Sequence, residues 1–256
     1  MNDPHVEALH YEIGTGSDSI SYGEPPAISF ENQIGAFNLA DGKLTIELSE
    51  HFSDEQQARQ LVDPFLRSWE IETDLTANLG QIRFTYRDSK IIDRDPPPPG
   101  TSQVIYARGI TSMLAVGGNV TVKITCGKYP EPPTAFTTTP DVELAHLRWT
   151  QFREGKETLP AMAYFVLDLI QKKAGGQKQA AKAFQISRNV LGKVGDLSSS
   201  KGDANTARKA DFKEMTGQEK AWLEHAVRKI IIRFGEHASG KPLDKITLAD
   251  LPELPQ

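Results

Sequence analysis

The side chains that could support acid–base or nucleophilic chemistry are few and scattered along the chain. Two acid–histidine neighbours occur, Glu50 with His51 and Glu224 with His225. Adjacent residues on a helix or strand do not face a common site, so neither pair predicts a catalytic dyad. The charged group at 93–95 could bind a ligand, but such groups more often end a strand in solvent. Because no HExxH, nucleophile elbow or paired acidic motif occurs, the sequence leans against an enzyme and predicts no catalytic residue and no cofactor.

One arginine–histidine pair has a spacing that would suit a catalytic pair. Arg233 and His237 would lie on one face of a helix. The pair resembles that of HEPN-type ribonucleases, although the spacing is shorter than usual and Phe234 stands where the family has a polar residue. Both cations could instead stabilise the C-terminal end of a helix through its dipole. A HEPN-like ribonuclease is therefore kept as an alternative function.

Residues 177–194 combine basic and apolar residues in a pattern that predicts two short helices joined by a tight turn. The apolar positions expected to face inward are Ala180, Ala181, Phe184, Ile186, Val190, Leu191 and Val194. A small residue such as Ala181 lets two helices cross closely. A purely structural helical hairpin would satisfy this pattern as well.

This stretch resembles the helix-turn-helix of the Fis-type family, in which a glutamine precedes paired small residues, a turn, an Asn/Ser-Arg pair and a leucine. The resemblance covers this segment and not the whole chain. It implies that the second helix enters the DNA major groove, with Ser187, Arg188 and Asn189 near base edges and phosphates. It also implies contacts to the DNA backbone from Lys178, Lys182 and Lys193.

Two residues in the stretch depart from the family pattern. Gln185 stands where the family has a glycine in a left-handed turn conformation, which costs a residue with a side chain about 1 kcal/mol. Gly192 weakens the second helix by about as much relative to alanine. Fis-type motifs act in symmetric pairs, so the resemblance also implies a homodimer.

Charge divides the chain more sharply than the net charge of −5 suggests. Residues 1–146 carry 10 Lys/Arg against 21 Asp/Glu, a net charge of −11. Residues 147–241 carry 18 against 10, or +8, and residues 242–256 carry 1 against 3, or −2. This asymmetry indicates that the basic part meets nucleic acid, that the two halves attract each other, or that the basic face is simply solvated. The second possibility predicts a protein interaction or accessory factor without nucleic-acid contact.

Composition limits the class of protein. The 256 residues, of which 38% are hydrophobic and 25% charged, are typical of a globular chain with two domains. Cys126 is the single cysteine, which excludes an intrachain disulfide and a zinc site built from several cysteines, and no metal site is expected. No apolar run reaches the roughly 20 residues of a membrane helix, and the N-terminus does not read as an export signal. We therefore expect a cytoplasmic protein with no membrane contact.

The predicted fold class is α+β, with a strand-rich N-terminal domain that has one main helix and an all-α C-terminal domain. Residues 1–26 are expected to be a loose segment, 27–128 an acidic α+β domain that serves as a partner or sensing module, 129–140 a proline-rich linker, and 141–256 a basic helical domain. Alternation predicts strands at 27–30, 44–48, 81–86, 90–93, 104–106 and 119–125. An apolar stripe predicts a helix from Ser53, kinked or broken at Pro64.

Beyond the linker the period of the apolar residues becomes helical. Helices are expected at 142–152 and 159–173, followed by the helical pair at 177–194. A small polar stretch at 198–209 predicts a mobile loop. Thr216 with Glu219 predicts a capped start for a long last helix, after which a short terminal piece covers 245–254.

Overall fold

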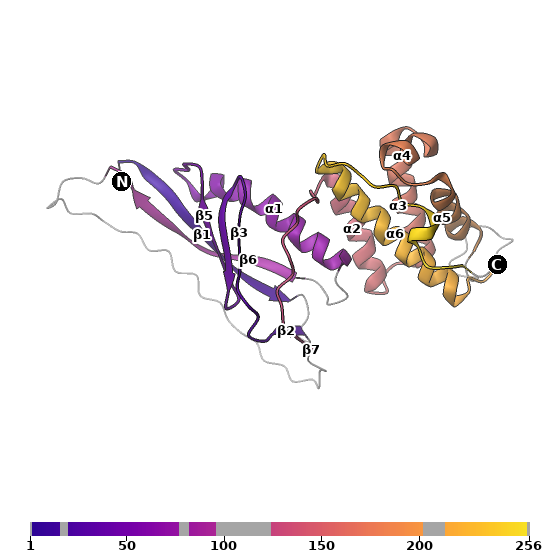
Figure 1. Cartoon of the computed structure of the whole chain (residues 1–256), viewed down its shortest axis with the longest axis horizontal. Coiled ribbons are helices and arrows are strands. Elements are labelled where there is room, and N and C mark those ends of the chain that lie inside the picture. The colour runs from indigo at the N-terminus through magenta and orange to yellow at the C-terminus, as the bar shows by residue number, and fades with distance from the viewer. Residues whose placement is uncertain (1, 16–19, 77–81, 96–123, 202–212, 255–256) are drawn as a thin grey trace. The chain divides into compact units, whose positions relative to one another are not determined.

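The computed structural model describes residues 2–15, 20–76, 82–95, 124–201 and 213–254. The chain forms two compact units, one of Met1–Leu66 with Ala77–Glu131 and one of Arg67–Thr76 with Pro132–Gln256. The first unit contains an antiparallel sheet and the start of one helix, and the second is helical, so the predicted α+β class is confirmed (Figure 1). The change of unit at residues 131–132 falls within the proline-rich stretch.

Five antiparallel strands form the sheet of the first unit, in the order β3, β4, β5, β1, β6. Their bounds are Pro4–Thr15 for β1, Ile28–Glu31 for β3, Gly35–Ala40 for β4, Lys43–Leu48 for β5 and Ile82–Asp93 for β6. β6 joins the two strands predicted at 81–86 and 90–93 into one, and β4 was not predicted. Asp41 and Gly42 connect β4 to β5, with φ values of 51° and 75° that suit a two-residue hairpin turn.

Strand β1 is an inner strand of the sheet and pairs with β5 on one side and β6 on the other. The prediction that residues 1–26 are a loose segment is therefore wrong for 4–15. The register against β6 shifts between Val6 and Ala8 and again between His10 and Tyr11. Such irregularities break the period of two that identifies a strand in sequence. The apolar side chains that β1 nevertheless buries are Val6, Ala8, Leu9, Tyr11 and Ile13.

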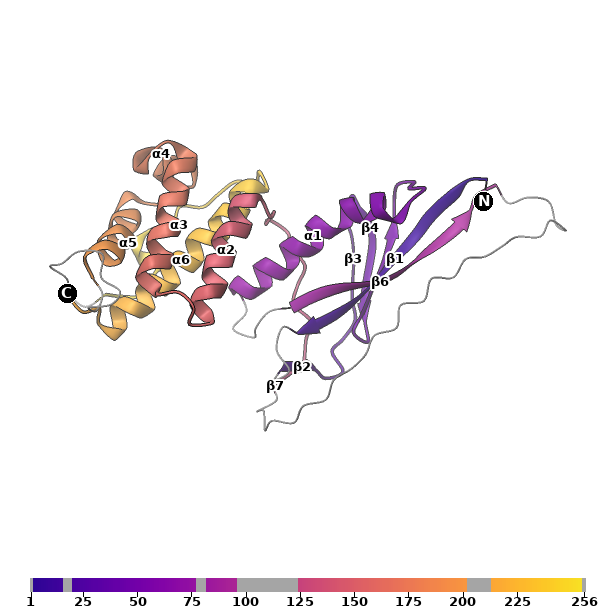
Figure 2. The same cartoon turned by 180° about the vertical axis from the view of Figure 1, so that it is seen from behind.

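In both views the first part of helix α1 (Glu55–Thr76), which belongs to the sheet unit up to Leu66, lies over one face of the sheet (Figures 1 and 2). The Phe65 ring lies 5.1 Å from that of Phe37 on β4, and the Tyr11 hydroxyl on β1 donates to Asp63 Oδ1 at 2.6 Å. Of the predicted kink or break at Pro64, the break is wrong, because the helix is continuous through that residue. Pro64 is exposed, so the backbone carbonyl that loses its helical donor one turn earlier lies on the solvent side.

A short parallel pair of strands completes the first unit, with β2 at Ile20–Tyr22 and β7 at Ile124–Cys126. β7 overlaps the end of the strand predicted at 119–125, whose earlier residues lie outside the described ones. The predicted strand at 104–106 also lies outside them, as does most of the loop predicted at 198–209. Residues 198–200 of that loop are helical.

The second unit packs its helices around α3. The helices are α2 (Pro140–Arg153), α3 (Leu159–Ala174), α4 (Gln177–Ala183), α5 (Arg188–Ser200) and α6 (Gly217–Ala238), and a 3₁₀ turn follows at Leu248–Asp250. Thr216 and Glu219 form the predicted capping box at the start of α6. Buried apolar side chains from all five helices share one core, among them Trp149, Met162, Val166, Ile170, Ala180, Leu191, Trp222 and Ile230. Within the described part of the chain, no helix is long and apolar enough to cross a bilayer.

Candidate nucleic-acid interface

Helices α4 and α5 are joined by a tight turn, as the sequence predicts. α4 ends at Phe184, Gln185 has a φ of 51°, and the Ile186 N–H donates to the Ala181 carbonyl at 3.1 Å. This hydrogen bond, together with the left-handed residue before it, defines a Schellman ending, in which glycine is the usual left-handed residue. The backbone at 185 thus has the conformation that glycine has in the Fis-type pattern.

The side chain of Gln185 compensates in part for the conformation of its backbone. Its Nε2 donates to the Lys182 carbonyl at 2.9 Å, which satisfies one of the unpaired carbonyls at the end of α4. Its own carbonyl accepts from the Ile246 N–H at 2.8 Å. The turn is therefore held from both sides without a glycine.

The inward-facing residues of the two helices are those that the sequence predicts, with one difference of degree. Six are buried in the core, and Ala181 is partly buried against it. The six buried residues are Ala180, Phe184, Ile186, Val190, Leu191 and Val194.

The outward face of the pair carries the predicted basic residues. Lys178, Lys182, Arg188 and Asn189 are exposed, and Lys193 is half-buried. None of these four cations forms an ion pair with another residue that the structure describes. By contrast, Lys172 and Lys173 at the end of α3 pair with Asp168 and Asp141, respectively. Unneutralised positive charge therefore gathers on α4 and α5.

Ser187 has a different role from its basic neighbours. Its hydroxyl accepts from the Val190 N–H at 3.3 Å and caps the start of α5. Its own N–H donates to the Ile246 carbonyl at 2.8 Å. Both interactions are internal, so Ser187 shapes the turn and α5 begins at Arg188.

Arg233 on α6 anchors the turn from the core side. It is 6% exposed, and its Nη1 donates to the carbonyls of Phe184, Gln185 and Asp244 at 2.9, 3.3 and 2.6 Å. Its Nε donates to Glu236 at 2.6 Å. Arg233, the arginine of the predicted HEPN-like pair, thus uses its donors to bind backbone carbonyls and Glu236. His237, its partner in that pair, lies 4.5 Å from the Phe184 ring.

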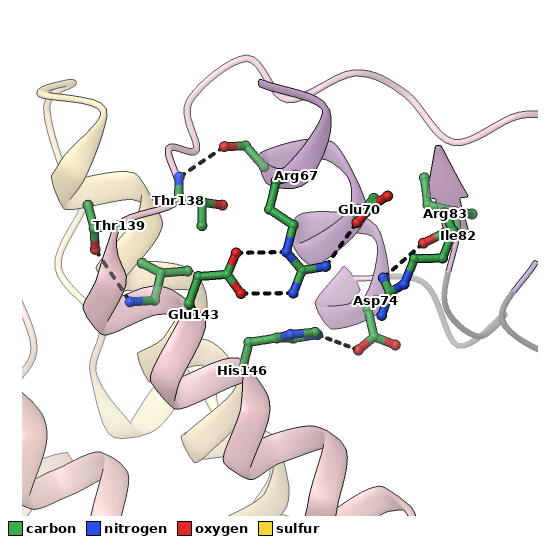
Figure 3. Close-up of polar contacts among 11 residues, drawn as sticks. Arg67, Glu70, Asp74, Ile82, Arg83, Thr138, Thr139, Glu143 and His146 are labelled. Carbon is green, nitrogen blue, oxygen red and sulfur yellow. Dashed lines mark hydrogen bonds and ion pairs between the residues drawn. The ribbon is translucent and has the colours of Figure 1, made fainter. Parts of the chain in front are cut away.

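A second polar cluster, which the sequence analysis missed, joins the end of α1 to α2 within the helical unit (Figure 3). Arg67 donates to both carboxylate oxygens of Glu143 at 2.7 and 2.8 Å and to Glu70 at 2.9 Å. These hydrogen bonds raise the pKa of Arg67 above its usual range, and the hydrogen bond to Glu143 contributes most. Beside them His146 contacts Asp74 at 2.7 Å. The partners are far apart in sequence, which is why no local motif identifies the cluster.

The geometry of this cluster suits packing rather than catalysis. His146 is 2% exposed, and its Nε2 is occupied by Asp74. The guanidinium of Arg67 is likewise held by two carboxylates. The His146–Asp74 pair is largely buried and the Arg67–Glu143 pair is partly exposed, and both join the end of α1 to α2.

The remaining candidates from the sequence do not come together. Asp93 accepts from the N–H groups of Asn2 and Asp3 at 3.0 Å, and these backbone hydrogen bonds lower its pKa, so it ties the chain start to the end of β6. His51 lies against His5, with 3.1 Å between their Nδ1 atoms. The described residues contain no group of three or more His, Cys, Asp or Glu placed to hold a metal ion. No protein-family model, curated protein or solved structure matches the chain.

The glycine inside α5 allows a direct test of how stable this helix is. A Cβ at Gly192 would meet only Gln177 Nε2, at 4.0 Å, so Gly192→Ala is expected to raise the free energy of unfolding of the helical unit by about 0.5–1 kcal/mol. Gly195→Ala in the same helix is the matched control, because its Cβ would lie 3.3 Å from Leu167 Cδ2 and the gain should shrink or vanish. Urea unfolding of both variants measures this, and equal gains would contradict the packing at Gly195.

Proposed function

We propose that the helical unit binds DNA through α4 and α5, with α5 in the major groove. The observation that carries this proposal is a group of four cations on α4 and α5 that form no ion pair with another described residue: Lys178, Lys182, Arg188 and Lys193. The two helices are joined by a tight turn with a left-handed residue at Gln185. Lysine and arginine side chains supply the salt-dependent affinity for the phosphate backbone. The sheet unit would act as a partner or sensing module, and the protein would act in the cytoplasm.

The exposed residues at the start of α5 are the ones we assign to sequence recognition. Arg188 and Asn189 occupy the first turn of the helix, which is the part of a recognition helix that reaches base edges. Arginine pairs well with guanine and asparagine with adenine. Lys178, Lys182 and Lys193 would bind phosphates, and Ser187 would keep the helix start in place.

The overall negative charge does not oppose this function. Residues 147–241, which include α4 and α5, carry a net charge of +8, so this segment presents a positive field to DNA, although the whole helical unit carries 20 Lys/Arg against 18 Asp/Glu, or +2, and the whole chain carries −5. The Fis-type resemblance further implies that two copies act together. A homodimer would bind two half-sites about one helical turn apart, a spacing that footprinting measures.

The test is a titration of labelled duplex DNA, followed by fluorescence anisotropy, at salt concentrations from about 50 to 200 mM. Removing two phosphate contacts with Lys178→Gln plus Lys182→Gln should lower the slope of log affinity against log salt by about 1.8. Arg188→Ala should weaken binding and relax sequence preference by about 1–3 kcal/mol.

The matched control is Lys172→Gln plus Lys173→Gln, which removes the same charge from lysines already paired with aspartates. It should change the slope much less. Absence of binding by the wild-type protein at low salt would contradict the proposal and favour the protein interaction factor. RNA cleavage that is lost in His237→Ala would favour the ribonuclease instead.

A further inference from the structure

The segment that follows α6 runs alongside the turn between α4 and α5. Ile246 donates its N–H to the Gln185 carbonyl and accepts from the Ser187 N–H, both at 2.8 Å, which makes a parallel bridge between Ile246 and Ile186. Arg233 Nη1 joins the Asp244 carbonyl to the carbonyls of the turn. The backbone is thus fixed against the turn on both sides of Lys245, directly at Ile246 and through Arg233 at Asp244.

This fixed backbone determines where Lys245 lies. Ile246 is 8% exposed and faces the core, and successive residues of an extended segment point to opposite faces. Lys245 is exposed accordingly, and it forms no ion pair with any residue that the structure describes. Extending the register of the parallel bridge by one position places Lys245 opposite Gln185, two residues before the Ser187 cap of α5.

We infer that Lys245 belongs to the same DNA interface and binds a backbone phosphate beside the turn. This inference rests on the proposed function. A recognition helix that enters the major groove by its N-terminal end brings the residues next to its start close to the sugar–phosphate backbone. Lys245 is placed there by the fold, although it is remote from α4 and α5 in sequence. A lysine contact of this kind adds affinity on any sequence.

The experiment measures DNA affinity and its salt dependence for Lys245→Gln on two unrelated duplexes. We expect binding that is about 3- to 10-fold weaker near 0.1 M salt on both duplexes, with the salt slope reduced by about 0.9. Lys245→Arg should restore wild-type binding, and the melting temperature should not change because the side chain is exposed. Lys220→Gln is the matched control, since Lys220 is an exposed lysine in the first turn of α6, at the opposite end of that helix from Arg233.

The outcomes distinguish the role of Lys245 from the proposed DNA binding on which it rests. If Lys178→Gln plus Lys182→Gln weakens binding while Lys245→Gln leaves affinity and slope unchanged, the role of Lys245 is refuted and DNA binding stands. If the wild-type protein does not bind DNA at low salt, both fail together. An equal loss in Lys220→Gln and Lys245→Gln would show an effect of net charge alone and would also refute the assigned contact.

Discussion

Arg233→Ala is expected to lower the free energy of unfolding of the helical unit by about 3–5 kcal/mol. The substitution removes a buried guanidinium that serves three backbone carbonyls and Glu236. The Phe184 carbonyl lies in a buried site, where it would lose this hydrogen bond without regaining one to water, whereas the Gln185 carbonyl would keep the Ile246 N–H as a donor. The same change should loosen the turn between α4 and α5 and the segment at 244–246.

Tryptophan fluorescence during urea unfolding is a selective measurement of this effect. All three tryptophans of the chain, Trp69, Trp149 and Trp222, belong to the helical unit. Arg233→Lys keeps the charge but not the planar donor fork, so its loss should be smaller. His237→Ala removes only a ring contact with Phe184 and should cost about 1 kcal/mol. An Arg233→Ala variant as stable as His237→Ala would contradict the anchoring role.

Gly35→Ala is expected to destabilise the sheet unit by about 2–5 kcal/mol. A Cβ at this position would lie 1.9 Å from the carbonyl oxygen of Glu47 on the neighbouring strand β5, and the backbone φ is +156°. The obstructing atom is backbone within a paired strand, so relief requires β4 and β5 to separate at that end.

Two other glycines in the sheet unit serve as controls for Gly35→Ala. Gly127→Ala meets nothing within 4 Å and should change stability by less than about 0.5 kcal/mol. Gly42→Ala also has room, but its φ of +75° should cost about 1 kcal/mol. Hydrogen exchange at the β4 and β5 amides locates the effect. Protection in Gly35→Ala equal to that in Gly127→Ala would contradict the close approach at Glu47.

Sequence patterns were most informative where structure depends on neighbouring residues. The capping box at Thr216 and Glu219 follows from local geometry and was predicted, and the left-handed backbone at Gln185 is the one that the Fis-type resemblance implies at that position. Strand β1 was missed because its register shifts disrupt the apolar alternation. The continuity of α1 was missed because whether Pro64 breaks a helix depends on which side of it faces solvent.

The contacts that hold α1 against α2, and those that anchor the turn of the candidate site, depend on residues distant in the chain. Arg67 and Glu143 are separated by 76 positions, and Arg233 and Phe184 by 49. No local period connects such partners, so their pairing is visible only in the folded chain. The basic residues of α4 and α5 could be predicted because charge is a property of composition, whereas the role of Ser187 depended on the hydrogen bonds around it.

Helix α1 crosses the division between the two units, and this affects how the chain could be separated into parts. The proline-rich stretch looks like the natural place to cut, yet Ile71 and Leu75 of α1 belong to the core of the helical unit. A polypeptide starting at residue 132 would lack the side chains of Ile71 and Leu75, which would leave a cavity in that core, and Glu143 would lose its ion pair with Arg67. The helical unit is therefore built from two separate segments of the sequence. Its complete folding requires contacts between residues far apart in the chain, in addition to those among its consecutive helices.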